Sequence, residues 1–255
     1  MKNAAAGIDI GGTKVRWTVI FDADAGANAH IGAGTRLRVH DAQEIETPQN
    51  QRQFENAFSA ICAGLHAQGV KNIGVSAAGI IADGVLRKSP NLPAFRDVDF
   101  KQLAPRGAAL RVDNDARCFA RAETMRLPGQ VAAREVARGD ILAIILGTGV
   151  GRALVRRGKI IPMARFERPE PWEKEYQRHV GDPAPRLAHF LAPKLADLIR
   201  ETRTTTVISG GGRFRTKDLY PELRKALCAC GVRAALHRSR FRQNSAAIGA
   251  ALLFC

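Results

Sequence analysis

Two short glycine-rich segments have the composition of phosphate-binding turns. The first is Gly11-Gly12-Thr13-Lys14, and the second is Gly147-Thr148-Gly149-Val150-Gly151. Glycine lets a backbone approach a phosphate closely, and the N–H groups of such a turn, with a threonine hydroxyl, can donate to phosphate oxygens. One segment of this kind is more often only a turn. Two of them, in corresponding positions of the two halves of a chain, predict a phosphate chain gripped from both sides of a cleft.

Two further features could complete a phosphate site. Asp9 lies at the end of the apolar stretch before the first glycine turn, where its carboxylate could hold a Mg²⁺ ion through water. Gly210-Gly211-Gly212 follows another predicted strand and is a third place where the backbone could approach a ligand closely. This third segment suits the sugar or base of a nucleotide, or more phosphate.

Asp115 is the residue best suited to acid–base chemistry. It follows a predicted strand and Asn114, at the point where a helix begins. A carboxylate at the rim of a cleft can accept the proton of a substrate hydroxyl while that oxygen attacks phosphorus, and Asn114 can hydrogen-bond to sugar hydroxyls. The alternative is an ordinary N-cap pair, as many helices have. The surrounding phosphate motifs favour the catalytic interpretation.

The composition is that of an ordinary globular protein. Of 255 residues, 45% are hydrophobic and 25% are charged. No stretch approaches the roughly 20 consecutive apolar residues that a membrane span needs. The N-terminal residues lack a secretory pattern, so we expect a cytoplasmic protein. The cysteines number five, and an odd number without a secretory signal argues against a disulfide framework.

The charge is strongly basic. The chain has 39 Lys and Arg against 24 Asp and Glu, which gives a formal net charge of +15. Such a surface attracts polyanions, although it can also be no more than a solvated basic surface. The sequence has no helix-turn-helix, zinc-finger or RNA-recognition signature, so we expect no specific nucleic-acid partner.

The first half of the chain alternates predicted strands and helices. Strands flank the first glycine turn between residues 4 and 20, and others are predicted at 31–39, 72–77 and 108–112. A hairpin is predicted around Asp83-Gly84. Apolar residues at helical spacing predict a helix near 51–68, and another is predicted from Asp115 to about 126.

The second half repeats this pattern. Strands are predicted at 141–146, 152–155, 159–161, 205–209 and 232–236, with a terminal helix at 245–254. A helical stretch from Leu187 to Ile199 contains Pro193, which predicts a kink or a break. The duplicated strand, turn and strand predict two related α/β lobes with a cleft between them. We place them at 1–115 and 116–255, with a terminal helix able to pack back on the first lobe.

The order of these motifs resembles that of the ROK (repressor, open reading frame, kinase) sugar kinases. The resemblance runs from end to end, and the combination is specific although each motif alone is not. The matching segments lie at residues 7–14, 74–81, 89–93, 112–116, 146–151, 208–212 and 246–251.

The resemblance implies a two-lobed α/β fold of the actin-like, hexokinase-like (ribonuclease H-like) ATPase class. It also implies a kinase that uses Mg²⁺ and transfers phosphate from ATP or polyphosphate to a hexose, such as glucose. By motif position, Asp115 corresponds to the general base. The positions that would contact sugar are Gly79, Asn91 and Asn114, and those that would contact phosphate include Gly12, Thr13, Thr148 and Gly149.

Two family features are missing. A Glu-x-Gly-His segment that helps to hold the sugar should follow the second phosphate motif, but residues 163–172 do not contain it. Glu167 or Glu170 could replace this contact, and Glu167 is our prediction. The cysteine-rich zinc loop is also absent, because Cys228-Ala229-Cys230 comes after the triple glycine rather than before it. We therefore expect no structural zinc.

The short second half resembles the compact polyphosphate glucokinase branch. A net charge of +15 fits a polyanionic donor, and Arg152, Arg156, Arg157 and Lys159 lie beside the second phosphate motif. A homodimer is a further expectation. The alternative is a catalytically weak or inactive protein that binds sugar or nucleotide, because the Glu-x-Gly-His segment is missing. Intact Asp115 and both glycine turns favour the enzyme.

Overall fold

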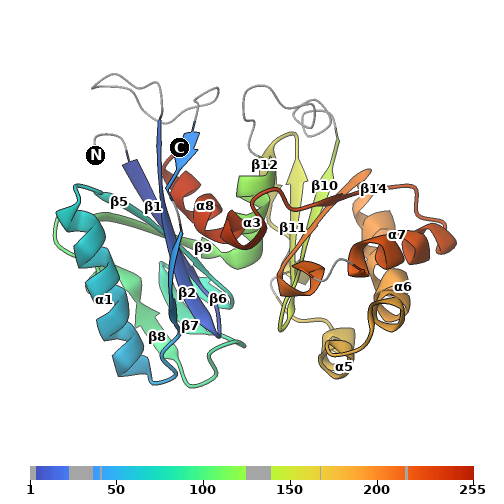
Figure 1. Cartoon of the computed structure of the whole chain (residues 1–255), viewed down its shortest axis with the longest axis horizontal. Helices are drawn as coiled ribbons and strands as arrows, with labels where there is room; N and C mark the ends of the chain where they lie inside the picture. Colours follow the sequence, from blue (N-terminus) through green and yellow to red (C-terminus); the bar gives the residue numbers. More distant parts are fainter. Residues whose placement is uncertain (1–3, 23–36, 41, 125–138, 167, 216–217) are drawn as a thin grey trace. The chain divides into compact units, whose positions relative to one another are not determined.

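The computed structural model describes residues 4–22, 37–40, 42–124, 139–166, 168–215 and 218–255 (Figure 1). The chain divides into two compact units. Unit 1 consists of Met1–Gln130 together with Asn244–Cys255, and unit 2 consists of Val131–Gln243. Each unit contains a mixed β-sheet and helices.

The described part of unit 1 holds two sheets. The larger has the strand order β3-β2-β1-β5-β9, with β4 also paired to β2, and the smaller has the order β6-β7-β8. Strand β1 pairs antiparallel with β2 and parallel with β5, which pairs parallel with β9. The elements, in chain order, are β1 (Ala4–Ile10), β2 (Lys14–Asp22), β3 (Leu37–Val39), β4 (Gln43–Glu46), α1 (Gln51–Ala67), β5 (Asn72–Ala77), β6 (Ile80–Ala82), β7 (Val85–Lys88), β8 (Arg96–Asp99), α2 (Phe100–Leu103), β9 (Ala109–Asn114), α3 (Asp115–Thr124), α8 (Ser245–Ala251) and the 3-10 turn η4 (Leu252–Phe254).

Three glycines bring the terminal helix close to the elements that carry Asp9 and Asp115. Gly7 on β1 and Gly74 on β5 are register partners. A Cβ atom at Gly7 would lie 1.8 Å from the Ala247 carbonyl oxygen of α8, and one at Gly74 would lie 1.9 Å from that of Ala250. A Cβ atom at Gly249 would lie 1.7 Å from the Cys118 carbonyl oxygen of α3. Only glycine permits such close backbone contacts, so these positions fix α8 against β1, β5 and α3.

Unit 2 has one described sheet, with the strand order β12-β11-β10-β13-β14. Strand β10 pairs antiparallel with β11 and parallel with β13, which pairs parallel with β14. The elements, in chain order, are β10 (Ile141–Leu146), β11 (Val150–Arg156), β12 (Lys159–Ile161), η1 (Ala164–Phe166), α5 (Pro171–His179), α6 (Ala184–Thr202), β13 (Thr206–Gly210), η2 (Gly212–Arg215), α7 (Leu219–Ala229), β14 (Ala235–Arg238) and η3 (Arg242–Asn244), which ends at the boundary with unit 1.

The two units repeat one topology, as the sequence predicted. The order β3-β2-β1-β5-β9 corresponds strand by strand to β12-β11-β10-β13-β14, with the same parallel and antiparallel relations. In each unit the glycine turn connects the central strand to its antiparallel neighbour. The phosphate motifs therefore lie at equivalent points of the two sheets.

Several elements differ from the sequence predictions. The short strands β4 and β8 and helices α2, α5 and α7 were not predicted. Helix α6 continues through Pro193, so the break that was one of the two expectations there does not occur. Of the strand expected at 31–39, residues 31–36 lie outside the described residues. The compact units also divide differently from the expected 1–115 and 116–255, because α3 packs against α8, β5 and β9 within unit 1.

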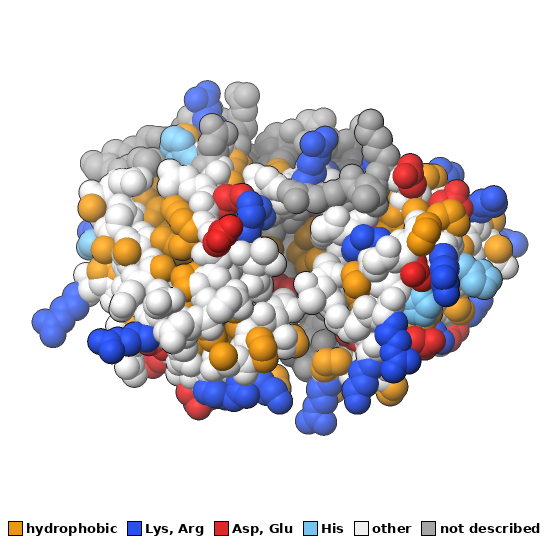
Figure 2. All heavy atoms as spheres, turned by 60° about the horizontal axis from the view of Figure 1, so that its bottom comes forward, with side chains coloured by type: hydrophobic (Ala, Val, Ile, Leu, Met, Phe, Trp, Pro, Cys, Tyr) orange, Lys and Arg blue, Asp and Glu red, His pale blue; other side chains and the backbone are white. Residues whose placement is uncertain are grey.

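The basic charge is concentrated in unit 2. Unit 2 contains 23 Lys and Arg against 11 Asp and Glu, a formal net charge of +12, whereas unit 1 contains 16 against 13. Figure 2 shows Lys and Arg side chains (blue) standing out from the surface on one face of the molecule. Among the described helices, none is both long enough and apolar enough to cross a membrane.

Candidate active site

Three parallel strands of unit 1 align polar residues at one edge of its sheet. Asp9 on β1 is the register partner of Ser76 on β5, which is the partner of Asp113 on β9. The Ser76 hydroxyl donates a hydrogen bond to Asp9 Oδ1 at 2.8 Å. The carboxyl ends of parallel strands meet at one edge of a sheet, where α/β proteins commonly bind ligands. Asp115 follows β9 and therefore begins at the same edge.

Asp113 is neutralised by helix α3. Its carboxylate accepts hydrogen bonds from Arg117 Nε at 2.5 Å and from Arg121 at 3.0 Å. These ion pairs hold β9 to the first two turns of the helix. Asp9 accepts a hydrogen bond from Ser76, and the charge of Arg16 also acts on its carboxylate. Asp9 and Asp115 are therefore the carboxylates available for chemistry at this edge.

Asn114 and Asp115 together cap the start of α3. The Ala116 N–H donates to Asp115 Oδ1 at 2.8 Å and to Asn114 Oδ1 at 2.9 Å. The N-cap role that the sequence left open is thus present. It occupies only the oxygen of the Asn114 side chain, and its amide nitrogen has no partner within the described parts of the chain. That amide can still donate to a ligand.

Burial dominates the electrostatics of the two carboxylates. Burial raises the pKa of Asp9 to about 6, the hydrogen bond from Ser76 lowers it, and the negative charge of Asp115 raises it. Burial also raises the pKa of Asp115, against the lowering effect of its backbone hydrogen bonds and of Arg117. A nearby cation would relieve this repulsion, since it favours the charged form of each acid.

Because the pKa of Asp9 is raised, its ionised carboxylate should lower the free energy of unfolding at neutral pH. Above pH 6 Asp9 is ionised in both folded and unfolded chains, and the folded environment disfavours that charge. Asp9→Asn should therefore increase the free energy of unfolding at pH 7, by up to about 3 kcal/mol from the shift in pKa. Well below pH 3.8, the ordinary Asp pKa, the carboxyl is protonated in both states, so the gain should already be small at pH 4 and vanish at lower pH.

Urea unfolding of Asp9→Asn at pH 4, 6 and 8, without magnesium or phosphate ligands, measures this effect. Glu46→Gln is a matched control, because Glu46 is an exposed carboxylate of β4. It should change stability little at any pH. A variant at Asp9 that is no more stable than the parent at pH 8 would show that the fold does not disfavour this charge.

The first glycine turn and the predicted sugar segments lie together in unit 1. A Cβ atom at Gly12 would lie 2.7 Å from the Asn91 carbonyl oxygen, so only glycine allows this contact. The Asn91 N–H donates to Ser89 Oγ at 3.2 Å. Gly79 has φ +142°, and a Cβ atom there would lie 2.2 Å from the carbonyl oxygen of Lys88, one residue before Ser89. The sequence motifs at Gly12, Gly79 and Asn91 thus form one contiguous cluster.

The Lys14 side chain, at the end of the first turn, forms an ion pair. Its ammonium contacts the carboxylate of Glu44, which also pairs with Arg16. Both pairs are at the surface, where they contribute little stability. The hydrogen bonds from Lys14 and Arg16 lower the pKa of Glu44. A phosphate contact from Lys14 would require the lysine to leave Glu44.

The carbonyl groups of Gly11, Gly12 and Thr13 in the first turn accept hydrogen bonds from the loop after β4. Thr47 Oγ1 donates to the Gly11 carbonyl at 2.7 Å, and the Thr47 N–H donates to the Thr13 carbonyl at 2.9 Å. Gln49 Nε2 donates to the Gly12 carbonyl at 3.0 Å. Thr47 is buried. The loop thus holds the turn from one side.

Helix α5 holds the second glycine turn in unit 2 in the same way. The hydroxyl of buried Tyr176 donates to the Gly147 carbonyl at 2.8 Å, and Gln177 Nε2 donates to the Thr148 carbonyl. The Gly149 carbonyl accepts from the Gly147 N–H at 3.0 Å. Burial raises the pKa of Tyr176 to about 12, so this phenol keeps its proton and remains a donor.

The triple glycine lies beside the second turn. Gly210 ends β13, and Gly211 has φ +99°. A Cβ atom at Gly211 would lie 2.4 Å from the carbonyl oxygen of Leu146, the residue before Gly147. At Gly212 a Cβ atom would meet no atom within 4 Å. Two of the predicted donor-binding segments are therefore adjacent within unit 2.

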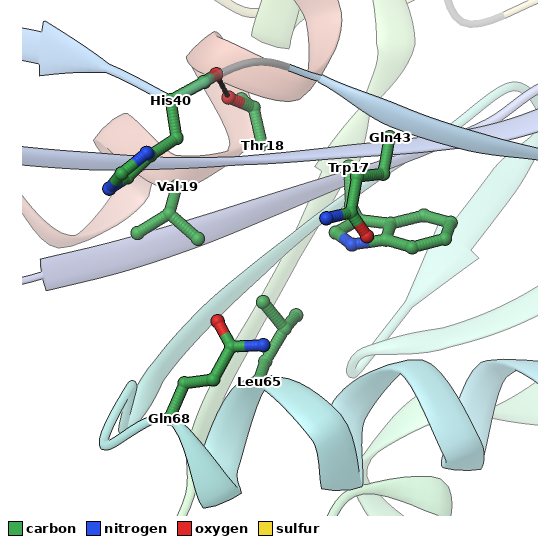
Figure 3. Close-up of a pocket in the computed structure, with 7 residues that line it drawn as sticks. All are labelled: Trp17, Thr18, Val19, His40, Gln43, Leu65 and Gln68. Carbon is green, nitrogen blue, oxygen red and sulfur yellow. Dashed lines mark hydrogen bonds between the residues drawn. The ribbon is translucent and has the colours of Figure 1, made fainter.

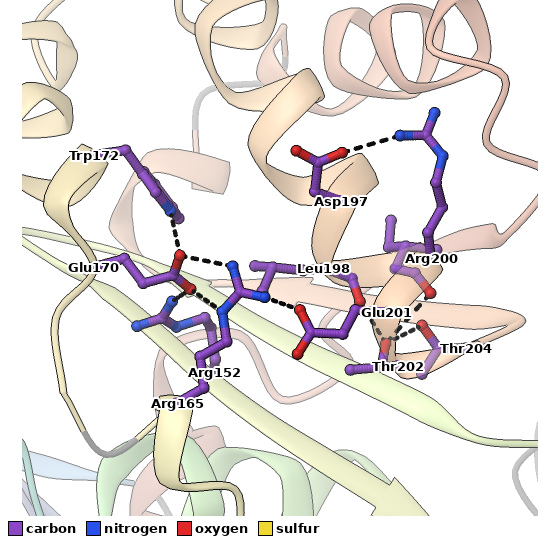
Figure 4. A network of polar contacts seen from close by, with 11 residues as sticks. Arg152, Arg165, Glu170, Trp172, Asp197, Leu198, Arg200, Glu201, Thr202 and Thr204 are labelled. Atoms are coloured by element: carbon purple, nitrogen blue, oxygen red, sulfur yellow. Dashed lines mark hydrogen bonds and ion pairs between the residues drawn. The ribbon is translucent and has the colours of Figure 1, made fainter.

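Within the described residues, neither of the two glutamates that could replace the missing sugar contact is seen in an open position that could meet a sugar. Glu167 lies outside the described residues. Glu170 accepts hydrogen bonds from Arg165 at 2.8 and 3.0 Å and from Trp172 Nε1 at 3.1 Å, and it also pairs with Arg152 (Figure 4). Burial raises the pKa of Glu170, but these cationic and hydrogen-bonding partners outweigh it and lower the pKa. Glu170 is thus fully engaged in a structural network.

Arg152 is the centre of that network. Its side chain is only 2% exposed, and it donates to Glu173 Oε1 at 2.5 Å and to the Arg168 carbonyl at 3.1 Å, as well as to Glu170. Glu173 Oε1 in turn accepts from the backbone N–H of Glu170 at 2.8 Å, which closes the capping box at the start of α5. The network ties β11 to the helix that holds the second glycine turn.

Other parts of the described chain offer less for chemistry. A hollow of about 220 Å³ lies between β2 and the end of α1 in unit 1 and contains none of the predicted site residues (Figure 3). It is lined by Trp17, Thr18, Val19, His40, Gln43, Leu65 and Gln68. Among the described residues, no group of three or more His, Cys, Asp or Glu side chains is placed to hold a metal ion.

Solved structures with the same arrangement identify the class of fold. The ROK family glucokinase from Streptomyces griseus, crystallised with glucose and AMPPNP, superposes with a TM-score of 0.73 at 21% identity, covering 98% of this chain and 99% of that one. The inorganic polyphosphate/ATP-glucomannokinase from Arthrobacter sp. strain KM gives 0.75 at 24% identity, covering 99% and 98%. Together with the repeated sheets, this similarity defines an actin-like, hexokinase-like α/β fold.

The sequence comparisons agree with this fold. The sequence model that describes the ROK family matches residues 5–162, and the chain belongs to that family. It is 25% identical over 231 residues to the polyphosphate glucokinase of Mycobacterium tuberculosis, which covers 85% of this chain and 80% of that protein. It is 26% identical over 166 residues to the N-acetyl-D-glucosamine kinase of Pasteurella multocida, covering 60% of this chain. The latter match spans 46% of that kinase, about half its length.

Several residues of the site were not predicted from the sequence. Ser76, Thr47 and Gln49 in unit 1, and Tyr176 and Gln177 in unit 2, all bond to predicted residues. Ser76 lies inside the sugar-loop segment and could have been found by aligning the ends of the predicted parallel strands. The other four had no recognisable signal, because they lie in irregular loops or in a helix that was not predicted.

Proposed function

We propose that this protein is a sugar kinase that transfers a phosphoryl group from ATP or polyphosphate to a hydroxyl of a hexose. The observation that carries the proposal is the edge of the unit 1 sheet. There Asp115 and Asp9 lie at the ends of parallel strands, in a unit whose glycine turn packs against Asn91. Membership of the ROK family and the kinase names of its relatives support the same reaction.

In this proposal Asp115 is the general base. Its carboxylate accepts the proton of the attacking sugar hydroxyl as that oxygen bonds to phosphorus, and the donor leaves with the bridging oxygen. The raised pKa of Asp115 makes it a stronger base than a free carboxylate. Its bond to the Ala116 N–H fixes the orientation of the side chain. Asn114, Asn91, Gly79 and Glu167 are the proposed sugar contacts.

The residues present fit a magnesium ion bound mainly by the donor. Mg²⁺ in phosphoryl-transfer sites is commonly held by one or two carboxylates plus substrate phosphates, and it keeps several waters. Asp9 would hold it through water, and the mutual repulsion of Asp9 and Asp115 would be relieved by such a cation. The ion supplies neutralisation of the negative charge that moves to the leaving phosphate.

The proposed acceptor is glucose or a related hexose. The structural relatives include a glucokinase solved with glucose and AMPPNP and a glucomannokinase. The sequence relatives include kinases of glucose and of N-acetyl-D-glucosamine. Glucose is our first choice, because the match to the polyphosphate glucokinase covers more of both chains.

The proposed donor is a phosphate chain that contacts the glycine turns. Gly11, Gly12, Thr13 and Lys14 in unit 1, and Gly147, Thr148 and Gly149 in unit 2, would meet the phosphates, while Gly210, Gly211 and Gly212 would meet a nucleotide or further phosphate. The formal charge of +12 on unit 2 favours a long polyanion over ATP alone. Polyphosphate is therefore a proposed donor beside ATP.

A donor-by-acceptor matrix tests the proposal. ATP and polyphosphate are each combined with glucose, mannose, fructose and N-acetyl-D-glucosamine at two ionic strengths, with Mg²⁺, and sugar phosphate is measured. We expect turnover of at least one hexose. Activity with polyphosphate should fall more steeply with salt than activity with ATP, because more charges on the donor are screened. Absence of sugar phosphate from every combination would refute the proposal.

The second candidate is a protein that binds sugar or nucleotide without catalysis. It is favoured only by the missing Glu-x-Gly-His segment, whereas Asp115, Asp9 and both glycine turns are intact. Hexose binding without turnover in the matrix would favour it. Cytoplasmic location and a homodimer remain predictions.

A further inference from the structure

In each glycine turn, two successive carbonyl groups accept hydrogen bonds from side chains of a neighbouring segment. In unit 1 the carbonyls of Gly11 and Gly12 accept from the side chains of Thr47 and Gln49, at 2.7 and 3.0 Å. In unit 2 those of Gly147 and Thr148 accept from Tyr176 and Gln177. Four side chains from a loop and a helix thus make the same kind of contact at equivalent turns.

These contacts fix the direction of the neighbouring N–H groups. A trans peptide unit is planar, so the C=O of one residue and the N–H of the next point in opposite directions. The bonds to Gly11 and Gly12 therefore direct the N–H groups of Gly12 and Thr13 away from Thr47 and Gln49. In unit 2, the corresponding N–H groups are those of Thr148 and Gly149, directed away from α5.

The N–H groups that are directed in this way are also unused. Within the described parts of the chain, the N–H groups of Gly12, Thr13, Thr148 and Gly149 donate no hydrogen bond to another group of the protein. Thr13 and Thr148 are exposed, and the two glycines are half-buried. Backbone N–H groups presented together by a turn attract anions.

We propose that Thr47, Gln49, Tyr176 and Gln177 are positioning residues that aim the N–H groups of the two glycine turns at the phosphates of the donor. They act through the turn and do not themselves touch the reacting atoms. The inference rests on the proposed function, since that function supplies the phosphate ligand. It adds four residues from elements that carry none of the sequence motifs.

Tyr176→Phe tests the contact in unit 2, because it removes only the hydroxyl. Without that donor the Gly147 peptide is free to rotate, and the Thr148 N–H loses its fixed direction. The KM for the donor and the Kd for ATP should rise about three- to tenfold, in line with the loss of one hydrogen bond, while the KM for hexose stays unchanged. Tyr220→Phe is the matched control. It removes a hydroxyl that donates to the Leu236 carbonyl in the same unit, and donor affinity should not change.

Thr47→Val tests the contact in unit 1. Valine keeps the shape of threonine and removes the donor to the Gly11 carbonyl, whereas Thr47→Ser keeps the hydroxyl and should restore donor affinity. Thr18→Val is the control, because the buried Thr18 hydroxyl donates to the His40 carbonyl at 2.6 Å, away from the turn. If Thr47 had only a structural role, Thr47→Val and Thr18→Val would lower the free energy of unfolding by similar amounts. Neither variant would then change the Kd for the donor.

Two measurements separate this inference from the proposed function. Isothermal titration with ATP and with polyphosphate measures donor binding without catalysis. The hexose assay measures formation of sugar phosphate independently of that binding measurement. If the parent phosphorylates hexose but Tyr176→Phe and Thr47→Val bind donor as the parent does, the positioning inference is wrong and the kinase remains. If the parent makes no sugar phosphate yet both variants weaken donor binding and their controls do not, the inference holds and the proposed reaction is wrong.

Discussion

Asp115→Asn should lower kcat for hexose phosphorylation by about a hundred- to ten-thousandfold, the usual contribution of a general base. Asparagine has nearly the same shape, and its amide oxygen can still accept from the Ala116 N–H that now bonds to Asp115. It cannot accept the proton of the attacking hydroxyl at neutral pH. The start of α3 should therefore persist while the chemical step is lost.

Two further measurements make this expectation specific. The Kd for ATP, measured by titration, should remain within about twofold of the parent, since the glycine turns are untouched. Asp83→Asn is the control: Asp83 is an exposed carboxylate in the turn between β6 and β7, and asparagine tolerates its positive φ of 55°. It should leave kcat unchanged. An Asp115→Asn protein as active as the parent would remove the catalytic assignment.

Arg152→Met should destabilise unit 2 by about 3 to 5 kcal/mol at pH 7, the usual effect of removing one partner from a buried ion pair. Methionine fills most of the space but leaves Glu173 without its cation, whereas Glu170 keeps Arg165 and Trp172. Burial already raises the pKa of Glu173. The variant should therefore recover stability as the pH falls and this carboxylate takes up a proton.

Urea unfolding followed by the fluorescence of Trp172, which bonds to Glu170, measures the effect near the network. Arg156→Met is the control, because Arg156 pairs with Asp140 at the surface with 44% of its side chain exposed. It should cost less than about 1 kcal/mol. Adding Glu173→Gln to Arg152→Met should restore part of the loss, since an amide carries no charge. Equal effects of Arg152→Met and Arg156→Met would contradict the role given to the buried network.

Features set by local sequence were predictable. Alternation and β-branched residues located the strands beside both glycine turns, and the spacing of Phe54, Phe58 and Leu65 located α1 almost to its ends. The predicted strand at 108–112, followed by the helix-capping residue Asn114, placed Asp115 at the junction of β9 and α3. The repeated order of strand, turn and strand was enough to predict that the two sheets share one topology.

Features set by distant contacts were not predictable. The four residues of β4 carry no strong strand pattern and become a strand only because β2 offers an open edge. Thr47 and Tyr176 hold turns that are 36 and 29 residues away in sequence. The sequence places Arg152 beside the second phosphate motif, among basic residues that would suit a polyanion, yet its side chain is buried against Glu173. Pro193 does not break α6, because tertiary packing of its apolar face outweighs the local preference.

The most direct test of the central claim is the phosphorus balance of one reaction. Purified protein, Mg²⁺, glucose and ATP or polyphosphate are followed by ³¹P NMR, with Asp115→Asn in parallel. We predict that each phosphate lost from the donor appears as one sugar ester with the parent protein, and that almost no ester appears with the variant. Donor consumed to free phosphate with no ester, or equal ester from both proteins, would contradict the account.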